Sequence, residues 1–195
     1  MKNLKVLSFL LFALLFGFAS CEDTVEVGEY DNWQEKNSMF IDSIAKIARA
    51  NEDGKWKMFS EIGLDENKLW GNSSYVYCYE NQCGSGTIHP AYNDTIEVYY
   101  RGRLIPSKSY SEGFVFDSSY DGELEPDFDP TVKMLLNDLV PGFNVAVQHM
   151  VAGDAWRIYI PYNLAYGSEE KTGIPAYSAL IFDINLVSFN HRGAN

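Results

Sequence analysis

The chain has 195 residues, 15% of them aromatic, and its 27 acidic and 15 basic side chains give a formal net charge of −12. Such a charge repels phosphate backbones and anionic lipid surfaces, so nucleic acid is excluded as an expected partner, as is attraction to a membrane by charge. With so many aromatic side chains, the chain is predicted to bury a sizeable core rather than to remain a disordered acidic tail.

Residues 1–20 are predicted to be a signal peptide. Lys2 and Lys5 precede an apolar or small-residue stretch, residues 6–19, that is too short to span a bilayer as a helix. The small residues Ala19 and Ser20 before Cys21 resemble a bacterial lipoprotein signal, in which the cysteine is acylated and becomes the new N-terminus. We therefore expect an exported protein anchored to a bacterial membrane by lipid on Cys21, on the periplasmic side of the envelope or at the cell surface. Ordinary secretion with a leftover thiol is the alternative.

The next two segments are predicted to be a tether and an amphipathic helix. Residues 21–31 are polar and acidic without periodicity, which indicates a tether. In residues 32–50 apolar side chains recur at helical spacing, and residues 51–54 supply a stop. Residues 55–70 fit either a second short helix or an irregular segment, and the pattern does not decide between them. The apolar face expected for the helix consists of Trp33, Phe40, Ile41, Ile44, Ile47 and Ala48.

From residue 71 onward the pattern is that of β-structure. Runs of β-branched and aromatic residues, separated by turn residues, predict strands. Pro141-Gly142, followed by apolar residues up to Met150, predicts one short helix that ends before Gly153. Several strands with one short helix indicate an α+β fold. The predicted strands cover residues 75–79, 95–101, 114–116, 132–139, 155–160 and 178–189.

The chain has three cysteines, and if Cys21 carries the lipid, two remain that could pair with each other, Cys78 and Cys83. In an exported chain this pair fits a local disulfide. Two reduced thiols in a strand and a turn fit equally well. A metal site is not expected, because no second Cys or His pair accompanies them.

Residues 84–190 carry a series of short motifs in a characteristic order. They are Gly84-Ser85-Gly86, Asn93 to Gly102, Phe116-Asp117-Ser118-Ser119, Val140-Pro141-Gly142-Phe143, Met150 to Gly153, Arg157 to Pro161, Leu164-Ala165-Tyr166-Gly167, Ile174-Pro175 and Leu180 to Asp183. Together they resemble the FK506-binding-protein (FKBP) type of peptidyl-prolyl cis-trans isomerase. The resemblance implies a twisted antiparallel β-sheet wrapped around one short α-helix, with an aromatic pocket between them. Residues 32–83 are assigned to an N-terminal helical region and first strand. Some similar exported members dimerise through such a region, so we expect it to supply either a homodimer contact or a contact with the client.

The implied reaction needs no cofactor and no metal, because no covalent bond is made or broken. The barrier of ~18–20 kcal/mol is lost amide resonance as the C–N bond twists. A twisted amide has less charge separation than a planar one, so a dry apolar pocket favours the transition state over the ground state. Aromatic walls suit the proline ring.

The resemblance implies a site of ten residues. Tyr166 would donate its hydroxyl to a substrate carbonyl, and the backbone N–H of Val140 would be a second donor. Asp117, held by hydrogen bonds at the rim, would orient the substrate, and it forms the implied catalytic set with Tyr166 and Phe116. The implied pocket lining consists of Tyr100, Phe116, Phe128, Leu139, Val140, Phe143, Ile174 and Phe182.

The sequence departs from the family pattern around this pocket. Phe143 stands where the family most often has tryptophan, and the connections over residues 104–113 and 124–137 are longer than usual. Acidic residues alternate with Leu124, Pro126 and Phe128, so a period of two would turn the acids outward and the apolar side chains inward. A solvated acidic edge is favoured there over a calcium site.

These observations predict a lipid-anchored isomerase that acts on X-Pro bonds of proline-containing polypeptide clients and helps exported proteins to fold. The alternative from another class is a non-catalytic proline-peptide binding module or chaperone that uses the same groove. A structural lipoprotein with the same scaffold is a third interpretation.

Overall fold

The computed structural model describes residues 28–65 and 68–191. The predicted signal peptide, Cys21 and most of the predicted tether lie outside the described residues. Over the described ranges, no helix has the length and apolar character that a membrane crossing requires.

The helix predicted over residues 32–50 is confirmed as α1, Trp33–Ala50. It ends at Asn51, whose N–H still donates to the Ile47 carbonyl in the helical pattern, and whose left-handed backbone (φ 43°) turns the following chain out of the helix. Ile47, predicted on the apolar face, is instead 50% exposed, because the buried stripe runs along the neighbouring side of the helix. That stripe consists of Trp33, Asn37, Ile41, Ile44, Ala45 and Ala48.

The undecided segment over residues 55–70 contains a strand, β1, Trp56–Ser60, so neither of the two interpretations was right there. β1 pairs antiparallel with β2, Tyr75–Gln82, from Trp56 opposite Tyr79 to Ser60 opposite Tyr75. A short edge strand of this kind is stabilised by its partner more than by its own sequence. A 3-10 turn, η1, Asn72–Ser74, leads into β2.

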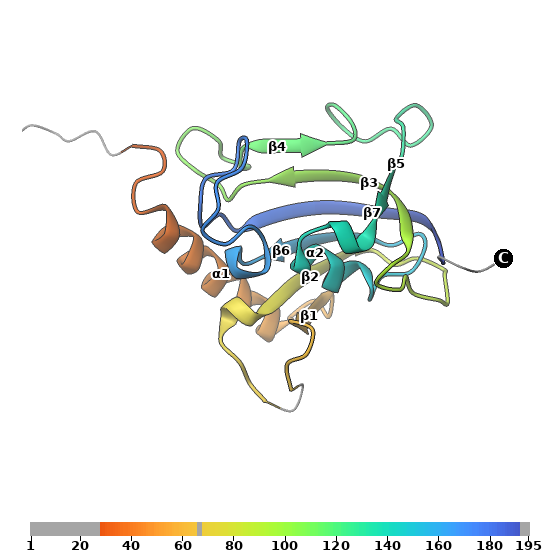
Figure 1. Cartoon of the computed structure of the whole chain (residues 1–195), viewed down its shortest axis with the longest axis horizontal. Helices are drawn as coiled ribbons and strands as arrows, with labels where there is room; N and C mark the ends of the chain where they lie inside the picture. Colours follow the sequence, from red (N-terminus) through yellow and green to blue (C-terminus); the bar gives the residue numbers. More distant parts are fainter. Residues whose placement is uncertain (1–27, 66–67, 192–195) are drawn as a thin grey trace, which may run out of the picture.

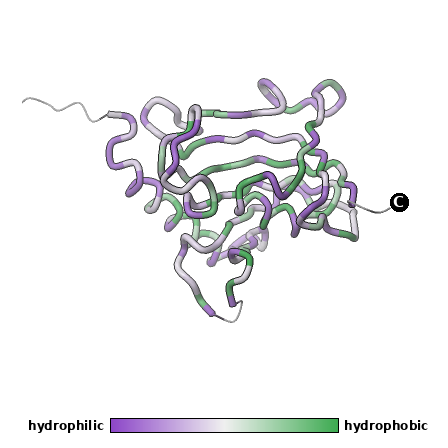
Figure 2. The backbone as a smooth tube through the Cα atoms, in the orientation of Figure 1, coloured by the Kyte–Doolittle hydropathy of each residue, from purple (hydrophilic) through white to green (hydrophobic). Residues whose placement is uncertain are grey.

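Seven strands form one sheet in the order β1-β2-β6-β7-β3-β4, and every paired strand is antiparallel (Figure 1). β5 pairs with residues 95–98 of β3, while β4 pairs with residues 101–103, so the two short strands share one edge of β3. Figure 2 shows hydrophobic residues recurring along the central strands. The remaining strands are β3, Thr95–Arg103; β4, Val115–Ser118; β5, Val132–Leu135; β6, Ala155–Ile160; and β7, Leu180–Asn190.

The short helix predicted at Pro141 is α2, Pro141–Val147, with proline in its first turn. The predicted strand over residues 132–139 is divided, because β5 ends at Leu135 and a 3-10 turn, η2, Leu136–Asp138, leads into α2. A third 3-10 turn, η3, Tyr162–Leu164, follows β6.

The two α-helices cover opposite faces of the sheet. A Cβ built on Gly142 of α2 would lie 2.3 Å from the Ile160 side chain, whereas the Phe40 ring of α1 lies 6.1 Å from the ring of Tyr159. Consecutive residues of a strand point to opposite faces, so α1 and α2 lie on different sides of β6. The structure thus has the α+β architecture expected, a sheet around one short helix, with α1 added on the outer face.

Two buried side chains of α1 tie this helix to the chain just before β7. The indole N–H of Trp33 donates to the Ser178 hydroxyl at 2.8 Å, and the backbone N–H of Ala179 donates to Oδ1 of Asn37 at 2.8 Å. Because β2 also pairs with β6, the boundary predicted between residues 83 and 84 falls inside a continuous sheet.

The structure does not pair Cys78 with Cys83, so the disulfide interpretation is wrong for it. The Cys78 side chain is buried in β2, whereas Cys83 is exposed after the strand ends. Residues five apart on an extended strand are separated by roughly 16 Å, far beyond the Cα distance that a disulfide bridges. Burial raises the pKa of the Cys78 thiol well above its ordinary value, which fits a structural rather than a reactive cysteine.

The alternation predicted for residues 121–129 is also wrong. Pro126 is exposed and Phe128 is 83% exposed, and the segment forms turns rather than a strand. Without a strand the period of two has no physical basis. In the described ranges no group of three or more His, Cys, Asp or Glu side chains is arranged to hold a metal ion.

Candidate functional site

A cavity of about 140 Å³ lies between α2 and the sheet. It receives residues from four strands, from η2 and α2, and from the turn after η3. Such a convergence of distant segments on one small apolar hollow is typical of a binding site. The lining consists of Tyr100, Phe116, Asp117, Met134, Asp138, Leu139, Val140, Phe143, Tyr166 and Phe182.

The sheet register directs the central rings into this cavity. Phe182 of β7 lies opposite Gly102 of β3, and a Cβ on Gly102 would lie 2.6 Å from the Phe116 ring and 2.7 Å from the Phe182 ring. Real Cβ atoms do not approach other atoms so closely, so only glycine lets β3 pass beside the two rings. Glycine at residue 102 therefore creates room for the aromatic wall.

Three phenylalanines form that wall. The Phe182 ring meets Phe116 edge to face at 5.6 Å between centroids, and it meets Phe143 in the same way at 5.2 Å. Edge-to-face pairs of this kind fix the orientation of each ring. Phe143 and Phe182 are buried and Phe116 is half-buried, so the wall is deepest at α2 and opens toward β4.

One polar pair lies beside the aromatic wall. Tyr100 donates its hydroxyl hydrogen to Oδ2 of Asp117 at 2.7 Å. Burial, together with this hydrogen bond, raises the pKa of Tyr100 above its ordinary value, so the phenol stays protonated at neutral pH. Asp117 is exposed on β4, and its bond to Tyr100 holds the carboxylate at the mouth of the cavity.

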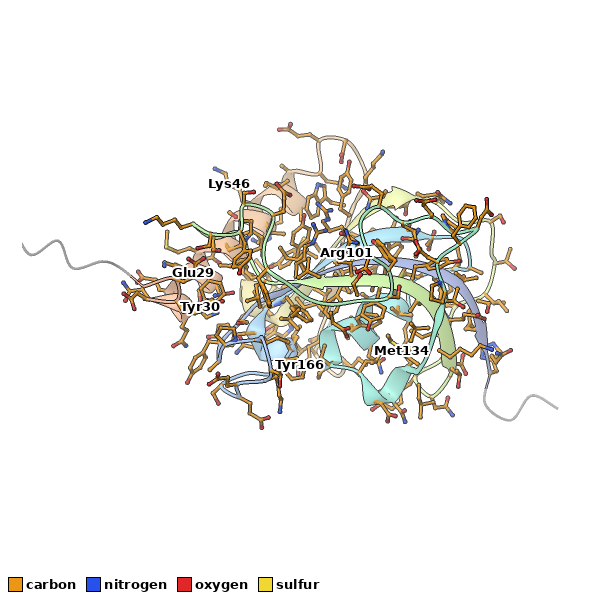
Figure 3. The ribbon with its side chains drawn as sticks, turned by 90° about the horizontal axis from the view of Figure 1, so that it is seen from above. Glu29, Tyr30, Lys46, Arg101, Met134 and Tyr166 are labelled. Atoms are coloured by element: carbon orange, nitrogen blue, oxygen red, sulfur yellow. The ribbon has the colours of Figure 1, made fainter. Side chains whose placement is uncertain are left out.

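Tyr166 closes another side of the mouth from the turn after η3. Its side chain is 36% exposed, and the ammonium of Lys171 lies 5.5 Å from its ring centroid. Figure 3 shows Tyr166 and Met134 on the α2 side of the molecule, with Arg101 on the other side of β3. Tyr166 is therefore placed to face a group bound at the mouth.

The structure brings together eight of the ten predicted site residues and leaves two apart. Phe128 points into solvent, and Ile174 is buried in the hydrophobic core rather than among the cavity-lining residues. Sequence reasoning missed Met134 and Asp138, which line the cavity. The alternation of Val132, Met134 and Leu136 was a signal for Met134, whereas Asp138 depends on the η2 turn. The eight are Tyr100, Phe116, Asp117, Leu139, Val140, Phe143, Tyr166 and Phe182.

The cavity suits a small neutral ring better than a charged or metal-bound ligand. Its walls are aromatic or aliphatic, and its carboxylates, on Asp117 and Asp138, belong to exposed residues. A larger hollow of about 630 Å³ lies between the start of α1 and residues 105–108 of the β3–β4 connection, but it lacks this aromatic convergence. We therefore identify the smaller cavity as the candidate site because of the side chains that line it, although the other hollow is larger.

Sequence comparison places the cavity inside a known family region. A profile of FKBP-type peptidyl-prolyl cis-trans isomerases matches residues 86–187, more than half of the chain. The macrophage infectivity potentiator of Trypanosoma cruzi is 42% identical over 111 residues, which are 56% of this chain and 50% of that protein. The 22 kDa FKBP-type isomerase of Escherichia coli K12 is 37% identical over 105 residues, 53% of this chain and 45% of that protein. The chain thus spans about half the length of the curated relatives it matches.

Solved structures show the same fold. A peptidyl-prolyl cis-trans isomerase from Pseudomonas syringae pv. tomato superposes with a TM-score of 0.54 at 24% identity, over 81% of this chain and 96% of that one. The crystal structure of FkpA from Escherichia coli gives a TM-score of 0.51 at 25% identity, over 82% of this chain and 64% of that one. These likenesses confirm the FKBP-like α+β fold expected from the sequence.

Proposed function

Because this chain belongs to the FKBP-type peptidyl-prolyl cis-trans isomerase family, we propose that it accelerates the cis-trans rotation of X-Pro bonds in exported polypeptide clients. The observation that carries the proposal is the convergence of three edge-to-face phenylalanines with Tyr166 and the Tyr100–Asp117 pair around one small cavity. The family relation supports the activity, and the cavity supports the substrate class.

The apolar wall would act on the amide itself. Rotation about C–N removes resonance and with it part of the charge separation, and the uncatalysed step takes tens to hundreds of seconds. A proline ring against Phe143 and Phe182 would displace water from the cavity, which favours the less polar twisted state over the planar one. Catalysis of this kind requires no nucleophile and no proton transfer.

The polar groups would orient the substrate. In this proposal the Tyr166 hydroxyl donates to a carbonyl beside the proline, and the backbone N–H of Val140 is a second donor. Asp117, bonded to Tyr100 at the mouth, would position the chain rather than exchange a proton. Fixing the carbonyl on one side lets rotation of the other side proceed without loss of binding.

Exchange measurements on the full chain with an X-Pro peptide test this function. Tyr166→Phe should lower kcat/KM by roughly two- to tenfold, because it removes one neutral hydrogen bond. Tyr110→Phe is the matched control, since it removes a hydroxyl from a ring that packs on Phe114 outside the cavity. NMR exchange spectroscopy would report both rates under the same conditions.

The same measurement separates the proposed enzyme from its rival. If the wild-type chain binds the peptide but does not accelerate exchange, the isomerase proposal fails and a non-catalytic binding module or chaperone takes its place. Equal losses in Tyr166→Phe and Tyr110→Phe would remove Tyr166 from its proposed role.

We also propose export with a lipid on Cys21 as the anchor, which rests on the sequence of residues 1–21. Two acyl chains hold a protein stably at a membrane, whereas one is marginal. Cys21→Ser should therefore move the protein from the membrane pellet to the soluble fraction of a bacterial lysate. Unchanged fractionation would contradict the anchor, and Cys83→Ser serves as the control because Cys83 lies far along the chain.

We also propose that residues 32–83 mediate the formation of a homodimer. Met39 and Ile47 on α1 are 65% and 50% exposed, and a second copy could cover them.

A further inference from the structure

A second groove adjoins the candidate site, and we name it the flanking groove. It has a volume of about 480 Å³, and its lining includes Ile62, Tyr92, Leu139, Pro141, Asn144 and Gln148. Leu139 lines both this groove and the aromatic cavity. The two hollows are therefore neighbours that share one apolar wall.

The flanking groove presents large apolar side chains to solvent. Ile62 is 62% exposed and Tyr92 is 54% exposed, Pro141 is also exposed, and Leu139 is half-buried. Single exposed apolar residues are common on protein surfaces, but several gathered in one concavity mark a binding surface. Ile62 comes from the β1–η1 connection and Tyr92 from the β2–β3 connection, whereas Leu139 directly follows η2 and Pro141 begins α2.

The amide side chains of the groove are turned toward the protein. Asn144 donates to the Leu136 carbonyl at 3.0 Å, and Gln148 donates to Oδ1 of Asn144 at 2.5 Å. Because these donors already have internal partners, the surface left to a ligand is chiefly apolar. The carboxylate of Glu61 at the groove and the net charge of −12 further disfavour an acidic ligand.

The size of the aromatic cavity explains why a neighbouring subsite matters. Sites that bury most of a ligand measure about 300–1,000 Å³, so a cavity of about 140 Å³ holds a single ring and little more. A polypeptide client continues on both sides of its proline, and three extended residues span roughly 10 Å. Because Leu139 lines both hollows, a client polypeptide that leaves the cavity past Leu139 would enter the flanking groove.

We propose that the flanking groove binds an apolar side chain of the client polypeptide a few residues from the proline. This inference rests on the proposed isomerase function and adds a sequence preference to it. Ile62 lies outside residues 86–187, so part of the preference comes from the N-terminal region of the chain.

Two peptides and three variants test the proposal on the full chain. One peptide is a short X-Pro tetrapeptide, and the other extends it with leucines on both sides. The wild type should have the lower KM for the extended peptide. Ile62→Ser and Tyr92→Ser should each raise that KM by roughly three- to tenfold, and more than they raise the KM for the tetrapeptide. Val187→Ser, which alters an exposed apolar residue of β7 outside the groove lining, should change neither KM.

Each result decides the proposal. Equal KM values of the wild type for both peptides, or equal shifts in Ile62→Ser and Val187→Ser, would overturn the flanking groove while leaving isomerase activity on the tetrapeptide intact. If the wild type accelerates neither peptide, the isomerase proposal fails separately. In that case a fluorescence titration that measures binding of the extended peptide tests the flanking groove. Weaker binding to Ile62→Ser than to the wild type would support the groove proposal, and unchanged binding would overturn it.

Discussion

Phe182→Ala should lower the free energy of unfolding by about 3–5 kcal/mol and reduce isomerase activity more strongly than Tyr166→Phe. The Phe182 ring is 8% exposed and contacts both Phe116 and Phe143 edge to face, so its removal leaves a void under the whole aromatic wall. Water can then enter the cavity, which removes the apolar surroundings that favour the twisted amide. Chemical denaturation measures the first effect and peptide exchange the second.

Phe128→Ala is the matched control for this prediction. It removes the same atoms from a ring that is 83% exposed, so the free energy of unfolding should change by no more than about 0.5 kcal/mol. The exchange rate should also stay unchanged, because the Phe128 ring lies in solvent outside the cavity lining. A loss of activity in Phe128→Ala would return this residue to the site that the family resemblance implied.

Trp33→Ala should also cost about 3–5 kcal/mol of unfolding free energy. Trp33 is 6% exposed at the start of α1, and its indole N–H donates to the buried Ser178. Ser178 and Ala179 directly precede β7, so the substitution loosens α1 from the strand that carries Phe182. Equilibrium denaturation of the full chain measures the loss.

Trp33→Phe separates ring burial from the hydrogen bond. It keeps most of the buried ring and removes only the donor, and the Ser178 hydroxyl retains its own bond to the Pro175 carbonyl at 2.6 Å. The expected cost is therefore about 0.5–1.5 kcal/mol. If Trp33→Ala proves no more costly than Trp33→Phe, the ring does not contribute to the docking of α1.

The contrast between β6 and β1 shows which elements a sequence can reveal. β6 was predicted over residues 155–160 and occupies those residues, because buried residues alternate with half-buried ones along it in a local pattern. β1 was missed, because a five-residue edge strand gains its structure by pairing with β2 some twenty residues further along. The local periodicity of a sequence indicates which side chains of a strand are buried, but it does not indicate which other strand will pair with it.

Phe128 and Met134 show the same limit at the candidate site. Motif order placed Phe128 in the pocket, yet the long connection between β4 and β5 leaves its ring in solvent. Met134 lines the cavity because β5 pairs with β3, with Met134 opposite Ile96. The position of a side chain on a long loop depends on contacts that no neighbouring residue encodes.

By itself the sequence determined the α+β class, the helix at residues 32–50, the family and eight residues of the candidate site. The acidic composition, which disfavours nucleic acid as a partner, also fits the proposal that the flanking groove binds apolar rather than acidic side chains. Only the tertiary structure decided that α1 docks on the outer face through Trp33 and Asn37, that Cys78 is buried apart from Cys83, and that a second groove meets the cavity at Leu139. The physical reason is that periodicity and motifs act over a few residues, whereas these features depend on surfaces that meet only when the sheet has closed around α2.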